Sequence, residues 1–148
     1  MILRRVRALT RQPERGSEAL EAAVGVPAFL LFIALIIFAG RVAIAHQAVE
    51  AAAADAARSA SIARTQGSAT SSGSSAATAS LANQKLQCSS KKVSVDTSGF
   101  ASPVGTPAKI TVAVTCVVNI SDLALPGIPG QLTVKSSMSS PIDTYRER

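Results

Sequence analysis

An uncharged apolar run near the N-terminus sets the strongest limit on what this chain can fold into. From Ala22 to Gly40 the sequence AAVGVPAFLLFIALIIFAG has 19 residues without a charge, bounded by Glu21 and Arg41. A helix of this length is about 28 Å long, close to the roughly 30 Å thickness of a bilayer's hydrocarbon core. The run therefore predicts a membrane-spanning helix, which leaves room for one modest domain in a chain of 148 residues.

Five of the fifteen basic residues of the chain lie close together before this run. The formal net charge is +6, but residues 1–16 hold five arginines and one glutamate, so the remainder is only +2. A cation excess on one flank of a spanning helix stays in the cytoplasm, so we expect a cytoplasmic N-terminus and an extracytoplasmic C-terminal part. A near-neutral remainder with 3% aromatic residues lacks the basic stripe and the stacking rings that nucleic-acid binding needs.

The same run has an alternative interpretation as a cleaved secretory signal peptide. The sequence Ala43-Ile44-Ala45 has the small-x-small form that signal peptidase prefers. Against this, the run exceeds the usual apolar region of roughly 7 to 15 residues, and Arg41 stands where a neutral segment is expected. The pattern favours a retained anchor.

The helical pattern continues beyond the apolar run. Alanine-rich sequence is strongly helical, so we predict one helix from about Glu18 to Arg64, roughly 70 Å long. Small apolar residues recur along it at steps of three and four, at Val49, Ala52, Ala53, Ala56, Ala60 and Ala63. This stripe has two interpretations: a surface for close approach of another helix, or one side of a solvated alanine helix.

The pattern then changes from helix to strand. The segment GSATSSGSS over 67–75 predicts a flexible linker, and a short helix is expected from Ala76 to Gln87. Apolar residues alternate over 110–120, which predicts the central strand of a small sheet.

Two further strands are expected beside the central one. Lys92–Thr97 and Gln131–Met138 are the candidates, and the turn-rich sequence from Leu125 to Gly130 joins the second strand to the third. We expect the tail from Ser139 to be extended, without regular pairing at Pro141, because proline cannot donate to a ladder.

The two cysteines fit an extracytoplasmic module. Cys88 precedes the first expected strand and Cys116 lies within the central one. A disulfide between them closes a loop of about 29 residues and stabilises by roughly 3 to 3.5 kcal/mol in the chain-entropy model. The alternative is a pair of buried thiols, which is less compatible with an oxidising exterior.

The sequence Arg15-Gly16-Ser17-Glu18-Ala19-Leu20-Glu21 stands directly before the apolar run. It resembles the class III signal of type IV pilins, which a prepilin peptidase cuts after glycine, with glutamate as the fifth mature residue. The resemblance makes Gly16 the last leader residue, Ser17 the new N-terminus and Glu21 the fifth. It also implies that Glu21 is neutralised by the N-terminal amine of a neighbouring subunit, since a lone carboxylate is costly in an apolar environment.

The segment from Arg15 to Ser61 is similar to the TadE-like (TadE/TadG) minor pseudopilins of the tight-adherence (Flp, type IVb) pilus system. The similarity includes the glycine before the glutamate-bearing start, a proline early in the helix, and the sequence AHQAVEAAAADAAR from Ala45 to Arg58. One departure is Phe38-Ala39-Gly40-Arg41, where the family often has an acidic or aromatic residue before the glycine. Specific subunit contacts at that point do not carry over.

Together these features predict an α+β protein: a long N-terminal transmembrane helix that continues into an alanine-rich helix, then a small three-stranded antiparallel sheet module. The expected parts are a basic cytoplasmic leader over 1–16, the helix over 17–64, the linker over 65–75 and the extracytoplasmic module over 76–148. The chain is expected in the cytoplasmic (inner) membrane, crossing it once, with the module at the cell surface or in a pilus.

The function that the resemblance implies is a structural or assembly component of a Tad (Flp) pilus or secretion apparatus. Its expected partners are prepilin peptidase, other pilins or pseudopilins, Tad pilus components and membrane lipid. The alternative is an uncleaved membrane protein whose module binds a cell-envelope ligand. We expect no enzymatic activity, cofactor or metal, because the sequence has one histidine and suggests no nucleophile paired with a base. His46 is interpreted as an interfacial side chain or an ion-pair partner of Glu50.

Overall fold

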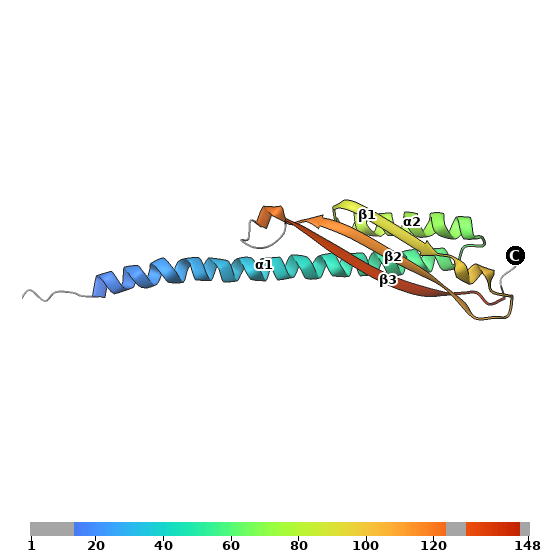
Figure 1. The fold of residues 1–148 in the computed structure, drawn as a ribbon, viewed down its shortest axis with the longest axis horizontal. Coiled ribbons are helices and arrows are strands. Elements are labelled where there is room, and N and C mark those ends of the chain that lie inside the picture. Colours follow the sequence, from blue (N-terminus) through green and yellow to red (C-terminus); the bar gives the residue numbers. More distant parts are fainter. Residues whose placement is uncertain (1–13, 124–129, 146–148) are drawn as a thin grey trace, which may run out of the picture. The chain divides into compact units, whose positions relative to one another are not determined.

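The computed structural model describes residues 14–123 and 130–145 (Figure 1). The described residues divide into two compact units between Ile37 and Phe38. The helices are α1 (Glu14–Ser61) and α2 (Gln66–Asn83). The strands are β1 (Cys88–Asp96), β2 (Ala108–Asn119) and β3 (Gln131–Ile142), and two short 3-10 helices are η1 (Ser98–Ala101) and η2 (Ser121–Leu123). The expected fold class, a long apolar helix followed by an α+β module, is confirmed.

The first unit contributes the N-terminal part of α1. Its large apolar side chains are exposed to the surroundings rather than packed in a core. The most apolar stretch of the helix has a mean hydropathy of 2.7, and none of it is buried. Within the described part of the chain, α1 is the one helix long and apolar enough to cross a membrane.

The second unit is built on an antiparallel sheet with the strand order β1-β2-β3. Ile110, Val112, Val114 and Cys116 are fully buried on one face of β2, while the residues between them are partly exposed. This is the alternation expected for a sheet with one covered face, so the prediction of a central strand is confirmed.

The covered face of the sheet packs on the small-residue stripe of α1. The stripe is buried at Ala45, Ala48, Val49, Ala52, Ala53, Ala56, Ala57 and Ala60. The interpretation as one side of a solvated helix was therefore wrong: the stripe belongs to the module's own core, and at Ala60 it allows the close approach of another helix, α2. The compact unit accordingly begins at Phe38, well before the expected boundary at residue 76.

The linker predicted over 65–75 is also wrong, because these residues form the cap and first half of α2. Thr65 caps the helix: its hydroxyl accepts from the Ser68 N–H at 3.1 Å, and the Ser68 hydroxyl accepts from the Thr65 N–H at 3.2 Å. Serine and glycine have weak helix propensity, but tertiary packing overrides it here. The helix then ends at Asn83, earlier than the expected Gln87.

α2 is antiparallel to α1 and lies close to it. The Ser80 hydroxyl donates to Asp55 Oδ2 at 2.7 Å, and the Ser59 hydroxyl donates to the Ser72 carbonyl at 3.4 Å. A Cβ placed on Gly73 would lie 3.3 Å from Ala60 Cβ and 3.3 Å from a methyl of Val95 on β1. Glycine therefore permits α2 to approach both α1 and β1, and Figure 1 shows α2 lying along β1.

β3 continues past the expected end at Met138. The tail is extended, as predicted, but the expected interruption of pairing at Pro141 is wrong, since Pro141 stands opposite Lys109 and Ile142 opposite Ala108. β3 is an edge strand, where proline's missing N–H can face away from the ladder. The predicted turn from Leu125 lies outside the described residues except at Gly130.

Candidate functional site

The predicted cysteine pair forms a disulfide in the structure. It joins the first residue of β1, Cys88, to Cys116 in β2, with a Cα–Cα distance of 5.3 Å. The ladder between the two strands is irregular between Cys88 and Ser90, which brings Lys91 opposite Cys116. The bridge therefore fixes the start of β1 where regular pairing is interrupted.

The residues of the predicted processing signal lie at the start of α1. Gly16 and Ser17 are helical, and Glu21 is exposed one helical turn after Ser17. The arginines at positions 4, 5, 7 and 11 lie outside the described residues. The structure thus places Gly16, Ser17 and Glu21 on one continuous helix that leads into the apolar run.

The histidine and carboxylate side chains considered in the sequence analysis make local contacts or do not contact one another. His46 and Glu50 are both exposed on α1, and no ion pair joins them. Asp96 accepts a hydrogen bond from the Ser98 N–H at 3.0 Å, which holds the pKa of that carboxyl below its usual range. Among residues 14–123 and 130–145, no three His, Cys, Asp or Glu side chains gather in a way that could hold a metal ion.

One end of the module carries an ion pair that the sequence analysis missed. An Arg41 guanidinium nitrogen donates to Asp122 Oδ2, which joins α1 to η2 across 81 positions of sequence. This hydrogen bond holds the pKa of the Asp122 carboxyl below its usual range, although both side chains are about half exposed. No pattern in the sequence pointed to this pair, because it depends on where the sheet returns to the helix.

Beside the ion pair is a groove of about 170 Å³. It is lined by residues of α1, the α2–β1 connection, the end of β2 and the start of β3: Arg41, Ile44, Ala45, Leu86, Val118, Asn119, Ile120 and Leu132. Ile44 is 63% exposed, while Leu86, Val118 and Leu132 are partly buried against the core. We name these eight residues the Arg41 groove.

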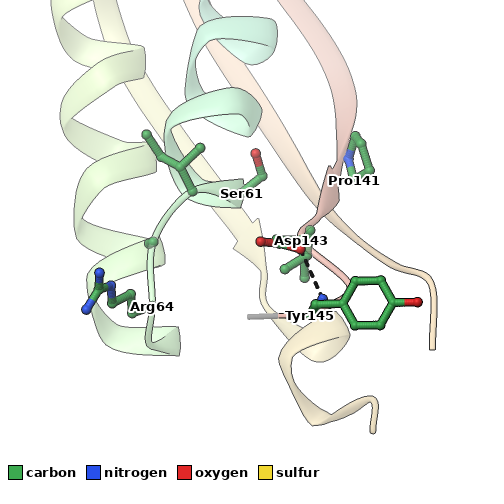
Figure 2. A pocket seen from close by; sticks show the side chains of 8 residues that line it. Ser61, Arg64, Pro141, Asp143 and Tyr145 are labelled. Carbon is green, nitrogen blue, oxygen red and sulfur yellow. Dashed lines mark hydrogen bonds between the residues drawn. The ribbon is translucent and has the colours of Figure 1, made fainter. Parts of the chain in front are cut away.

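The other end of the module has a larger hollow of about 450 Å³ (Figure 2). It is formed where α1 ends and β3 leaves the sheet, by Ser61, Ile62, Ala63, Arg64, Pro141, Ile142, Asp143 and Tyr145. Figure 2 shows the Asp143 carboxylate between Ser61 and the backbone of Tyr145, and this carboxylate accepts a hydrogen bond from the Tyr145 N–H at 3.0 Å. Ile62 and Tyr145 are 80% and 81% exposed, so two large apolar side chains border this distal hollow.

These features define a class of protein: a small disulfide-linked α+β module carried on a helix that is apolar and long enough to cross a membrane. Residues 16–58 match the model of the TadE-like protein family, which confirms the resemblance. The match spans 43 of the 148 residues of the chain. It covers nearly all of α1, including most of the buried stripe, and ends before α2. No curated protein and no solved structure matches the chain.

Proposed function

We propose that this protein is a minor pseudopilin of a Tad (Flp) pilus or secretion apparatus, processed by prepilin peptidase between Gly16 and Ser17. The observation that carries the proposal is the extent of the family match. It begins at Gly16 and includes Ser17 and Glu21, the three residues that the processing signal needs. The match then continues through the apolar run, which would anchor the subunit.

Cleavage requires the first turn of α1 to unwind, since a peptidase acts on extended backbone. Glycine is about 1 kcal/mol less favourable than alanine in a helix, so Gly16 lowers the cost of opening this turn. After cleavage the new amine of Ser17 lies one turn from Glu21 on the same chain. In an assembly, the amine of one subunit would neutralise Glu21 of its neighbour, which removes the cost of a lone carboxylate beside the bilayer core.

The proposed location is the cytoplasmic membrane, crossed once, with the module outside. The positive leader supports this orientation, and the disulfide is compatible with an oxidising exterior. A cut after Ala45 by signal peptidase is disfavoured, because α1 is helical through this position and Ala45 is buried in the module. The helix therefore serves as a retained anchor in this proposal.

The distal hollow supports a role in contacting other pilus components. Exposed Ile62 and Tyr145 beside Arg64 provide aromatic, apolar and guanidinium groups, the side chains enriched at protein interfaces. We propose a structural role in assembly rather than catalysis. The same hollow is also the observation that favours the second candidate, an uncleaved anchored protein whose module binds a cell-envelope ligand.

Processing separates the two candidates and is our first prediction. Coexpression with a prepilin peptidase should shorten the chain by the 16 residues that precede Ser17, as measured by intact mass spectrometry. Gly16→Val should remain full length, because a branched side chain replaces the glycine at the cut. Gly25→Val is the control, since its position in α1 is open and outside the signal, and it should be processed normally. A wild-type chain that retains its leader would refute the pseudopilin proposal and favour the uncleaved alternative.

A further inference from the structure

The Arg41 groove lies next to the end of the apolar run. Phe38 to Gly40 finish this run, and Arg41 and Ile44 follow within about one turn of the same helix. All of these residues belong to the compact unit that begins at Phe38. If α1 crosses a bilayer over Ala22–Gly40, the groove opens at the level of the lipid headgroups.

The chemistry of the groove combines an apolar floor with hydrogen-bond donors. Ile44 is largely exposed, and Leu132 on β3 is partly buried. Arg41 uses one guanidinium nitrogen for Asp122, which leaves other N–H groups of its fork available. Asn119 accepts from the Ser121 N–H and hydroxyl through Oδ1, so its amide nitrogen remains a donor without a partner among the described residues.

The size and charge of the groove limit the kind of molecule that it can bind. Its volume of about 170 Å³ is below the roughly 300–1,000 Å³ of a small-molecule pocket, so it accommodates part of a larger molecule. Arg41 and Asp122 together are neutral and present one charge of each sign. This arrangement complements a zwitterionic group in which a phosphate and an ammonium are neighbours.

We propose that the Arg41 groove binds the headgroup and glycerol region of phosphatidylethanolamine from the bilayer that α1 crosses. The phosphate accepts hydrogen bonds from Arg41, the ammonium faces Asp122, and the first acyl carbons contact Ile44 and Leu132. This inference rests on the proposed membrane anchoring.

Introduced tryptophans can test this inference, because the natural chain has none. Leu132→Trp places a reporter in the groove, on the sheet rather than on the anchor helix. Met138→Trp is its matched control: it lies on the same face of β3, it is also partly buried against the core, and it is about 20 Å further along the strand. Ile36→Trp reports on the apolar run and so tests the anchoring separately.

The full-length variants are inserted into vesicles of phosphatidylethanolamine and phosphatidylglycerol, with phosphatidylethanolamine brominated on the acyl carbons nearest the glycerol. We expect the emission of the Ile36 and Leu132 reporters to be quenched and that of the Met138 reporter to be retained. Quenching at Ile36 without quenching at Leu132 would overturn the groove proposal and leave the anchor intact. An unquenched Ile36 reporter would instead overturn the anchoring on which the proposal rests.

A second comparison distinguishes headgroup binding from mere proximity to the bilayer. In the Leu132→Trp background, Arg41→Gln should reduce quenching, whereas Arg58→Gln, an exposed arginine on α1 outside the groove, should not. Brominated phosphatidylcholine, whose quaternary ammonium has no N–H donor, should quench the same reporter less. Equal quenching in both arginine variants and with both lipids would refute the proposed headgroup contact. Each variant is first checked for the intact disulfide and for cooperative unfolding.

Discussion

At the scale of single residues, Arg41 and Asp122 connect two parts of the chain that are 81 positions apart. The sequence predicted the helix that carries Arg41, but neither η2, which carries Asp122, nor the pair. Residue patterns report on periodicity and local turns, whereas this contact depends on the register of β2 and on how the sheet crosses α1. The disulfide was predictable for a different reason: two cysteines in one small module leave one possible intramolecular bridge.

The Arg41–Asp122 pair predicts a specific titration behaviour. The hydrogen bond from Arg41 lowers the pKa of Asp122 in the folded protein, so its stabilisation is present above the carboxyl's unfolded pKa and is lost as pH falls through the folded pKa. Carboxyl-detected NMR titration should show that Arg41→Gln raises the pKa of Asp122. Asp96 is the internal control, because the Ser98 N–H lowers its pKa, and it should not change. An unchanged Asp122 in Arg41→Gln would contradict the pair.

The position of Glu21 predicts that its removal affects membrane insertion and pilus assembly differently. Removing a carboxylate from the edge of an apolar run lowers the cost of insertion, so Glu21→Ala should reach the membrane fraction at least as well as the wild type. If a neighbouring amine pairs with Glu21, the same variant should lose crosslinks to pilus components in the same cells. Glu18→Ala, three residues earlier, should keep them. Normal crosslinking in Glu21→Ala would show that the carboxylate has no role in assembly.

At the scale of elements, α2 shows why a local composition can mislead. Its first half is rich in serine and glycine, which predicted a linker, yet Ala69, Gly73, Ala77 and Leu81 recur every fourth residue and are all buried. This spacing was visible in the sequence and is the helical signal that composition obscured. The capping box at Thr65 and Ser68 was a second, weaker signal.

The close approach at Gly73 predicts a stability difference between two glycines of α2. Gly73→Val should destabilise the module by about 1 to 3 kcal/mol, because the added carbons meet Ala60 and Val95. Gly67→Val is the matched control, since a Cβ at position 67 would meet nothing within 4 Å, and it should change stability little. Urea unfolding of the oxidised variants measures both. Equal midpoints would mean that α2 is not packed at Gly73 as described.

At the scale of the whole molecule, the module cannot be separated from its helix at the boundary that the sequence suggested. The buried stripe of α1 supplies one side of the core, so the fold needs residues that composition assigns to an anchor extension. The alanine pattern did not indicate that this part of α1 belongs to the core, because a helix of small residues is equally compatible with burial, with solvent and with another helix. The choice between these is made by the partner surface, here the covered face of the sheet.

This division predicts how fragments behave. A fragment of residues 41–148 keeps the stripe and lacks the apolar run, so it should fold in water with one cooperative thermal transition. A fragment of residues 65–148 loses the stripe and exposes Ile110, Val112 and Val114, so it should lack that transition or aggregate. Circular dichroism during heating compares them. Similar transitions in both fragments would show that α1 is dispensable for the module.

Because α1 carries the apolar run and also forms part of the module's core, tension along this helix reaches the module as shear. In shear, the packed positions from Ala45 to Ala60 bear the load together, whereas peeling would break them one after another. Forced unfolding is governed by the rate of crossing the unfolding barrier, so an interface that must yield all at once resists a brief pull. A protein built in this way can transmit mechanical force between its apolar helix and any molecule that binds its module.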